Sequence, residues 1–214
     1  MVAKLDLSPS SSTTGLLLHR AARYDFVVWL AMFGKERVFR EKVLRLAGLE
    51  PGESVLDVGC GTGTLAIAAK RYVGPTGAVY GIDASPKMLA RANKKASKGG
   101  VDVVFKNAFA QTLPFPDAQF DAVLTTMMLH HLPRKARQQC ASEMRRVLNP
   151  GGRVVAVDFG GAQQQQKGIF SHFHRHGHVN LREIIAVLSE AGLNIVESGA
   201  VGIKDLQFVL ATAP

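Results

Sequence analysis

Cysteine is scarce in this chain of 214 residues, which contains only Cys60 and Cys140. Two cysteines do not form the disulfide framework of a small secreted domain, so we expect a protein of the reducing cytoplasm. Long apolar stretches are also missing, because the longest unbroken one, residues 26–33, is too short to cross a bilayer. The N-terminus has no apolar segment of the kind found in signal peptides, so we expect neither a leader nor a membrane span.

Tyrosine is equally scarce, and all three residues, Tyr24, Tyr72 and Tyr80, lie in the first 80 positions. The Tyr-x-x-x-Lys pair of short-chain NAD-linked oxidoreductases is therefore absent. Acidic residues are also in the minority, since 26 Lys and Arg stand against 17 Asp and Glu and give a net charge of +9. Attraction to RNA or anionic lipid is one interpretation of the clusters at 87–98 and 134–137. No aromatic residues are interleaved with these cations, so we favour solvated helix faces and expect no nucleic-acid partner.

The most informative stretch is residues 54–64, where a short apolar run precedes three glycines at alternate positions, Gly59, Gly61 and Gly63. Helical periodicity begins directly afterwards. A buried strand, a glycine-rich turn and a helix form the arrangement with which α/β proteins bind nucleotides at the carboxyl end of a strand. We expect glycine here because a side chain would occupy the space of the ligand.

The spacing indicates which ligand. Dinucleotide sites have Gly-x-Gly-x-x-Gly, whereas this chain has Gly-x-Gly-x-Gly with Asp57 two residues before the first glycine. An acid there would repel a pyrophosphate but suits S-adenosylmethionine (SAM), which carries a sulfonium and an α-ammonium group. Asp83 ends a second predicted strand, 79–83, where an acid accepts hydrogen bonds from both ribose hydroxyls of an adenosine.

Length and composition favour one α/β domain. We expect residues 1–15 to be a flexible N-terminus and 16–214 a single domain, in which 16–47 form a helical cap over the ligand crevice. Helices are predicted at 35–47, 86–98, 134–148 and from a capping box of Asn180 and Glu183 to about 191. Further strands are predicted at 101–105, 120–124, 153–158, 193–198 and 206–212.

Four segments in this order resemble the class I SAM-dependent methyltransferases, and they lie at 55–63, 113–117, 129–132 and 148–152. The likeness covers about residues 20–214 and is closest to the small-molecule group that includes the ubiquinone/menaquinone C-methyltransferases. It implies a Rossmann-like, doubly wound sheet of seven strands, mostly parallel with one antiparallel strand. It also implies transfer of a methyl group from SAM to a small-molecule acceptor. We expect a monomer or a homodimer.

The resemblance implies a cofactor site made of residues from several loops. Its members are Tyr24, Asp57, Gly59, Cys60, Gly61, Thr62, Gly63, Asp83, Ala84, Met88, Phe109, Ala110 and Thr126. Thr62 and the glycines approach the methionine moiety, Asp83 holds the ribose, and Thr126 lies beside the sulfonium. Tyr24 lines the pocket or belongs to the core, and Met88 packs on the adenine or in the core.

One position departs from the family pattern. The family usually has Asp or Asn where this chain has Phe109, and that polar side chain holds the adenine amino group. Phenylalanine cannot accept a hydrogen bond, so Phe109 either stacks on the ring or turns into the core. The backbone of Ala110 would then contact the adenine.

Methyl transfer from a sulfonium has a neutral, good leaving group, so the protein mainly positions and desolvates the reactants. A base is needed only if the acceptor carries a proton. His130, His131 and Asp158 are candidates, although one histidine could instead pack under the cap while the other bonds a loop. The catalytic residues stay open. An apolar mouth, predicted from Trp29, Phe33, Met127, Met128 and Leu129, indicates a partly apolar acceptor.

Four alternating histidines, His172, His174, His176 and His178, would point to one side of an extended segment. They could bind a metal or an anionic substrate, but they follow a glutamine run, which favours an exposed insertion. We expect no metal.

Two other functions stay open, a non-catalytic SAM-binding protein and a methyltransferase of nucleic acid or protein. The second lacks support, because Thr-Thr-Met-Met at 125–128 replaces the Asn- or Asp-Pro-Pro-Tyr of amino-methylating enzymes. Neither cysteine is placed as the nucleophile of a pyrimidine C5 enzyme.

Overall fold

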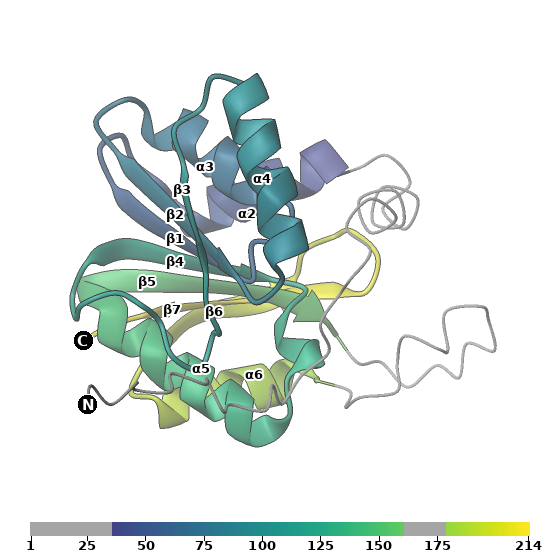
Figure 1. Cartoon of the computed structure of the whole chain (residues 1–214). Coiled ribbons are helices and arrows are strands. Elements are labelled where there is room, and N and C mark those ends of the chain that lie inside the picture. Colours follow the sequence, from purple (N-terminus) through teal and green to yellow (C-terminus); the bar gives the residue numbers. More distant parts are fainter. Residues whose placement is uncertain (1–35, 161–178) are drawn as a thin grey trace, which may run out of the picture.

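The computed structural model describes residues 36–160 and 179–214 (Figure 1). Its strands are β1 (Ser54–Val58), β2 (Ala78–Asp83), β3 (Val104–Asn107), β4 (Phe120–Thr126), β5 (Leu148–Phe159), β6 (Asn194–Ala200) and β7 (Leu206–Thr212). They form one sheet in the order β3-β2-β1-β4-β5-β7-β6, and β7 is antiparallel to both of its neighbours. The predicted seven-stranded, mostly parallel Rossmann-like sheet is confirmed.

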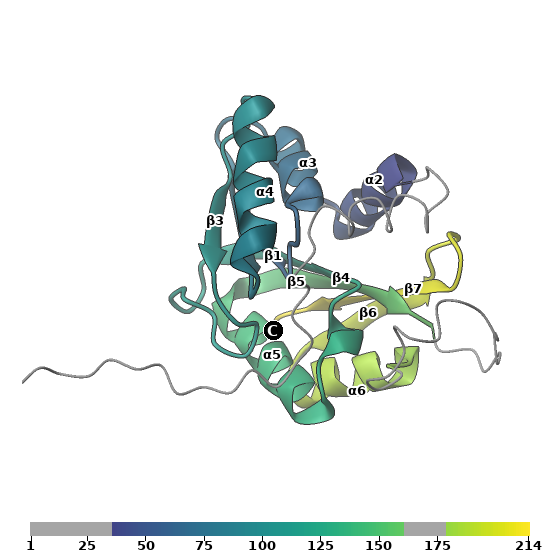
Figure 2. The same ribbon diagram turned by 45° about the vertical axis from the view of Figure 1, so that its right-hand side comes forward.

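Helices cover both faces of the sheet (Figures 1 and 2). They are α2 (Glu36–Ala47), α3 (Thr64–Val73), α4 (Pro86–Lys98), the short 3₁₀ helix η1 (Leu129–His131), α5 (Arg134–Val147) and α6 (Leu181–Glu190). Helices α2 and α3 share one hydrophobic core with the sheet, and α5 and α6 share the other. Helix α4 packs beside α3 against β2 and β3. None of these helices is both long and apolar enough to span a bilayer.

The described part of the predicted cap is α2. Its apolar face, which includes Phe39 and Val43, is buried in the same core as α3 and the sheet. Arg153 of β5 fastens the end of this helix, because its guanidinium donates to the Gly48 carbonyl at 2.7 Å and pairs with Glu53 at 2.7 Å. Residues 16–35 of the predicted cap and the predicted flexible segment 1–15 lie outside the described residues.

Local capping rules explain where two helices start. The Ser85 hydroxyl accepts a hydrogen bond from the Met88 N–H, and Pro86 takes the first helical position of α4, as predicted. At α6 only half of the predicted capping box forms, since Asn180 accepts from the Glu183 N–H at 2.9 Å. The Glu183 side chain pairs with Arg137 of α5 instead, because that partner is a buried cation.

Two strands start more than one residue away from the predicted position. Strand β3 starts at Val104 rather than at 101 and ends at Asn107, where pairing with β2 places Asn107 opposite Asp83. Strand β5 starts at Leu148, which pairs with Phe120, rather than at 153, and residues 149–152 form an irregularity inside the strand. In both cases the partner strand decides the boundary, and an apolar pattern alone does not reveal it.

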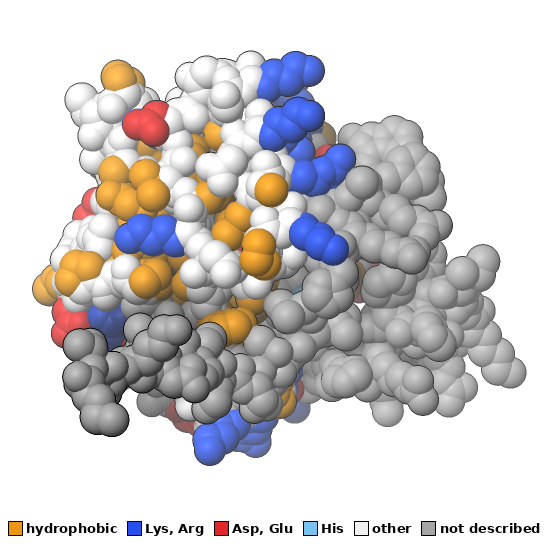
Figure 3. Space-filling view, in the orientation of Figure 1, with side chains coloured by type: hydrophobic (Ala, Val, Ile, Leu, Met, Phe, Trp, Pro, Cys, Tyr) orange, Lys and Arg blue, Asp and Glu red, His pale blue; other side chains and the backbone are white. Residues whose placement is uncertain are grey.

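Helix α4 carries a row of cations and no acidic residue. Lys87, Lys94 and Lys98 are exposed, and Figure 3 shows a column of Lys and Arg side chains along this helix. The cations lie on the solvent side of an amphipathic helix whose other face, including Met88 and Ala92, is buried.

Candidate functional site

Acidic and hydroxyl side chains gather where four parallel strands end. Asp57 lies in β1, Asp83 ends β2, Thr126 ends β4, and Asp158 is the second-last residue of β5. The neighbours of β1 are β2 on one side and β4 on the other, so the chain reverses its strand order there. Open α/β sheets bind ligands in the crevice at such a switch point.

Asp83 ties the glycine turn to the start of α4. Its carboxylate accepts the Gly61 N–H at 2.9 Å and the Ser85 N–H at 2.8 Å. Burial raises the pKa of Asp83, and the two N–H donors oppose that shift. The Asp83 side chain therefore fixes the backbone of the turn and is half-buried at the same edge of the sheet.

Asp57 is buried without a partner. The residue is 1% exposed, and among the described residues neither carboxylate oxygen has a hydrogen-bond partner. Burial, and then the negative charge of Asp83, raise the pKa of Asp57 to about 7. An unpaired buried carboxylate is costly, so this position is matched to a positively charged group that the described residues do not supply.

The glycine turn is shaped by its protein neighbours. Gly59 and Gly63 have φ of 75° and 74°, which favours glycine. A Cβ would lie 2.4 Å from Met128 Cγ at Gly59 and 2.6 Å from the Phe105 ring at Gly63. Packing by the protein's own side chains is therefore sufficient to require glycine at these two positions. The expectation that glycine also leaves room for a ligand stays a prediction.

The other residues predicted for the site lie around this turn. The Thr62 hydroxyl accepts from Lys95 Nζ of α4 at 2.7 Å, and Cys60 is buried with its pKa raised by burial. Met88 is 2% exposed in the buried face of α4. Phe109 is 38% exposed, so the alternative that it turns into the core is wrong. Ala84, Ala110 and Thr126 are half-buried.

Several predicted residues lie outside the described ranges. They are Tyr24, Trp29, Phe33, and the histidines at 172, 174, 176 and 178. Of the described part of the chain, no group of His, Cys, Asp or Glu side chains could hold a metal ion.

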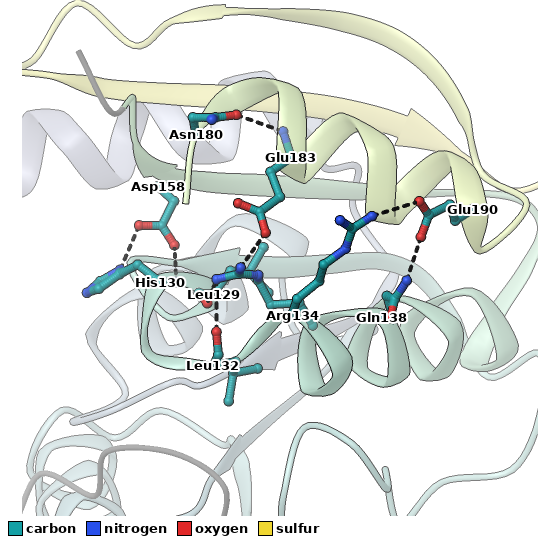
Figure 4. Close-up of polar contacts among 10 residues, drawn as sticks. Leu129, His130, Leu132, Arg134, Gln138, Asp158, Asn180, Glu183 and Glu190 are labelled. Atoms are coloured by element: carbon teal, nitrogen blue, oxygen red, sulfur yellow. Dashed lines mark hydrogen bonds and ion pairs between the residues drawn. The ribbon is translucent and has the colours of Figure 1, made fainter. Parts of the chain in front are cut away.

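His130 lies in the turn after β4 beside Asp158 (Figure 4), and His131 is the next residue of that turn. The imidazole Nδ1 of His130 lies 2.7 Å from Asp158 Oδ1. The backbone N–H of His130 donates to Asp158 Oδ2 at 3.1 Å. The His131 ring lies tilted beside that of His130, with the ring centres 3.9 Å apart and an angle of 47° between the ring planes. Burial, and then the charge of His130, lower the pKa of His131 to about 4, so His131 is neutral near pH 7.

Arg137 of α5 supports this turn through its hydrogen bonds, and this role was missed in the sequence. It is 4% exposed, pairs with Glu183, and donates to the Leu132 carbonyl at 2.9 Å and the Leu129 carbonyl at 3.5 Å. A signal was present, since Arg137 stands in the apolar stripe of α5 one turn before Cys140 and Ala141.

Comparison with known proteins identifies the family. Residues 55–152 match a family model described as a methyltransferase domain. The chain is 37% identical over 155 residues to the demethylmenaquinone methyltransferase of Thermus thermophilus. The aligned residues cover 72% of this chain and 68% of that relative. The chain belongs to the class I SAM-dependent methyltransferases.

This methyltransferase is also 37% identical over 139 residues to a ubiquinone/menaquinone biosynthesis C-methyltransferase of Bordetella avium, covering 65% of this chain and 54% of that enzyme. It thus spans little more than half the length of that relative. A solved SAM-dependent methyltransferase of Aquifex aeolicus has a TM-score of 0.73 and 25% identity, over 91% of this chain and 97% of the other. The [4+2]-cyclase SpnF, at 21% identity and a TM-score of 0.71, shares the fold alone. Since a cyclase has this fold, the reaction must be argued from the site.

We expect Arg137→Met to destabilise the methyltransferase by about 2–4 kcal/mol, because it leaves Glu183 and two carbonyls of the histidine turn without their donor. Arg134→Met is the matched control on the same helix. Its pair with Glu190 is exposed and 3.5 Å long, so its loss should cost less than about 0.5 kcal/mol. Urea unfolding measures both variants, and equal losses would contradict the supporting role of Arg137.

Proposed function

We propose that this methyltransferase binds SAM at the carboxyl edge of β1 and β2 and transfers the methyl group to a small, partly apolar acceptor. The observation that carries the proposal is the buried Asp57 carboxylate, which has no partner among the described residues. A carboxylate with a raised pKa beside a glycine turn fits a ligand with fixed and ionisable positive charges. The family membership independently favours the same cofactor.

Different residues of the site would contact different parts of SAM. Asp83 would hold the ribose, Asp57 would face the positive charge, and the turn from Gly59 to Gly63 would approach the methionine moiety. Ala84, Met88 and Ala110 would bound the adenosine, and the exposed Phe109 ring would stack on the adenine. Cys60, Thr62 and Thr126 would complete the site, and Tyr24 would close it. When bound, SAM supplies an electrophilic methyl group on a neutral leaving group.

The acceptor side of the proposal rests on the apolar surroundings of the histidine turn. Met127 and Met128 are half-buried there, and Phe159 is 37% exposed with its ring 5.2 Å from that of His130. Relatives are named for ubiquinone/menaquinone biosynthesis, which makes an aromatic acceptor and transfer to carbon the favoured chemistry. We further propose a cytoplasmic monomer or homodimer that needs no nucleic acid, in keeping with two free, buried cysteines.

Calorimetric titration with SAM and S-adenosylhomocysteine tests the cofactor site. Asp83→Ala should weaken both ligands at least about tenfold, because the ribose and the Gly61 N–H lose their acceptor. Asp102→Ala, at an exposed acid between α4 and β3, is the matched control and should bind like wild type. A thermal scan of each variant separates loss of binding from loss of fold. Wild type that binds neither ligand would overturn the proposal.

Transfer is tested separately from binding. The enzyme is incubated with methyl-labelled SAM and metabolite extracts, and labelled products are isolated. Tight SAM binding without label transfer to any acceptor would favour the alternative of a non-catalytic SAM-binding protein.

A further inference from the structure

We propose that His130 is the general base of this site and that Asp158 positions it, so that the acceptor is an aromatic hydroxyl compound that gives up a proton. This inference rests on the proposed function, since it concerns the acceptor of the same methyl transfer. It adds the catalytic residue and the chemical class of the acceptor.

The first support is the way Asp158 holds the imidazole. Asp158 is 0% exposed, and its Oδ1 lies 2.7 Å from His130 Nδ1 and accepts the Phe159 N–H at 2.8 Å. Its Oδ2 accepts the backbone N–H of His130 at 3.1 Å. A carboxylate can only accept, so the proton of the short contact lies on Nδ1. The lone pair of the neutral ring is then on Nε2.

The second support is that the turn is fixed on several sides. The Met127 N–H donates to the Val157 carbonyl at 2.8 Å, which joins the end of β4 to β5. Arg137 holds the carbonyls of Leu129 and Leu132 on either side of the two histidines. A base on a rigid support keeps its geometry toward a bound acceptor, as efficient proton transfer requires.

The third support is the position and access of the ring. The His130 side chain is 19% exposed, and it lies at the carboxyl end of β4 and β5, at the sheet edge that carries Asp57 and Asp83. The Phe159 ring packs edge-on beside it and offers an apolar surface to an aromatic acceptor. His131 is the poorer base, because burial and the neighbouring His130 lower its pKa to about 4.

The step balances without a further reagent. His130 Nε2 takes the proton of the acceptor hydroxyl, and the electrons of that bond increase the electron density of the oxygen and the conjugated ring carbon. A pair from that carbon or oxygen forms the bond to the methyl carbon while the sulfur–methyl bond breaks and its electron pair stays on sulfur. After transfer to carbon, loss of the ring proton restores aromaticity. The imidazolium is stabilised by Asp158, as in other histidine–carboxylate pairs.

The first test needs no acceptor. In protein with ¹⁵N-labelled histidine and bound S-adenosylhomocysteine, NMR at pH 8 should show His130 protonated on Nδ1 and unprotonated on Nε2. Asp158→Asn should lose that single tautomer. A wild-type His130 protonated on Nε2 would overturn the proposal.

The second test uses two probes, 1,4-naphthoquinol, which carries acidic hydroxyls, and N,N-dimethyl-1-naphthylamine, whose nitrogen has no proton to lose. With methyl-labelled SAM, wild type should methylate only the quinol. His130→Gln should lower that rate at least about 10²-fold, and the rise of rate with pH should disappear. Asp158→Asn should also lower the rate and alter the pH profile, whereas His131→Gln should keep the profile of wild type.

Calorimetry with SAM separates this proposal from the proposed function. His130→Gln should bind SAM within about threefold of wild type, because the residue acts on the acceptor. If wild type binds SAM but methylates only the amine, or neither probe, the acceptor class is wrong. If His130→Gln keeps the rate and pH profile of wild type, the base is wrong. Failure of wild type to bind SAM would overturn the proposed function itself.

Discussion

Asp57→Asn is expected to stabilise the free protein at pH 8 while weakening its binding of SAM. In the folded chain the pKa of Asp57 is raised from 3.8 to about 7, mainly by burial. That difference corresponds to roughly 4 kcal/mol of instability when the group must be ionised. Asparagine removes the buried charge but leaves a buried amide, so we expect a net gain of about 1–3 kcal/mol in the free energy of unfolding.

The pH dependence of this effect has a defined sign. Between pH of about 4 and about 7 the folded chain keeps a proton on Asp57 that the unfolded chain has lost. The contribution of Asp57 to stability therefore falls as pH rises through that window. The stability difference between Asp57→Asn and wild type should be smallest near pH 4 and reach its full size near pH 8. Urea unfolding at both pH values measures it.

SAM binding should change in the opposite direction. A positively charged ligand favours the ionised carboxylate, so the affinity of wild type for SAM should rise as pH increases through about 7. In Asp57→Asn the affinity should be lower by at least about tenfold at pH 8, and this part of the pH dependence should vanish. Calorimetry at pH 6 and pH 8 tests both statements.

Asp83→Asn is the informative comparison, because the two acids differ in their partners. The Asp83 carboxylate accepts the N–H groups of Gly61 and Ser85, so its replacement should weaken the fold as well as SAM binding. No described residue makes a hydrogen bond of good geometry to Asp57, and the Ala66 N–H lowers its pKa only against the larger effect of burial. An Asp57→Asn protein that is less stable than wild type at pH 8 would contradict the view that this carboxylate is held for a ligand.

Capping preferences and residue spacing predicted several helix starts and the two acidic site residues. The start of α4 follows from Ser85 and Pro86, whose capping preferences depend only on neighbouring residues. Asp57 was found from its place two residues before the first glycine, and Asp83 from its place at the end of the second predicted strand. The seven-stranded topology came from a resemblance, since periodicity alone does not specify which strands are neighbours.

The features that were not predicted are contacts between distant residues, some of which were themselves named as candidates. His130 and Asp158 are separated by 28 positions, and only the pairing of β4 with β5 brings them together. Arg137 looks like a surface cation until α6 places Glu183 against it. For the same reason the contact between Thr62 and Lys95 of α4 was not predicted, because the two residues are brought together only by the packing of α4. A sequence lists the chemical groups, but their partners depend on the packing of separate elements.

A substitution in the glycine turn should have a large effect on stability. Gly63→Ala should destabilise the fold by about 2–5 kcal/mol. The left-handed backbone, with φ of 74°, contributes about 1–2 kcal/mol for a residue with a Cβ. Close packing contributes a further 1–3 kcal/mol, roughly, since the new methyl group would lie 2.6 Å from the Phe105 ring and 2.7 Å from the Ala92 Cβ.

Gly100→Ala separates these two contributions. Gly100 also has a left-handed backbone, with φ of 59°, but its Cβ would have no atom within 4 Å. Its replacement should therefore cost only about 1–2 kcal/mol, as measured by urea unfolding. The double variant Gly63→Ala/Phe105→Leu should recover at least about 0.5 kcal/mol relative to the sum of the single variants, because the smaller side chain relieves the clash. Equal losses for Gly63→Ala and Gly100→Ala, without coupling to Phe105, would show that packing does not require glycine in this turn. Space for a bound ligand would then be the better explanation for glycine at position 63.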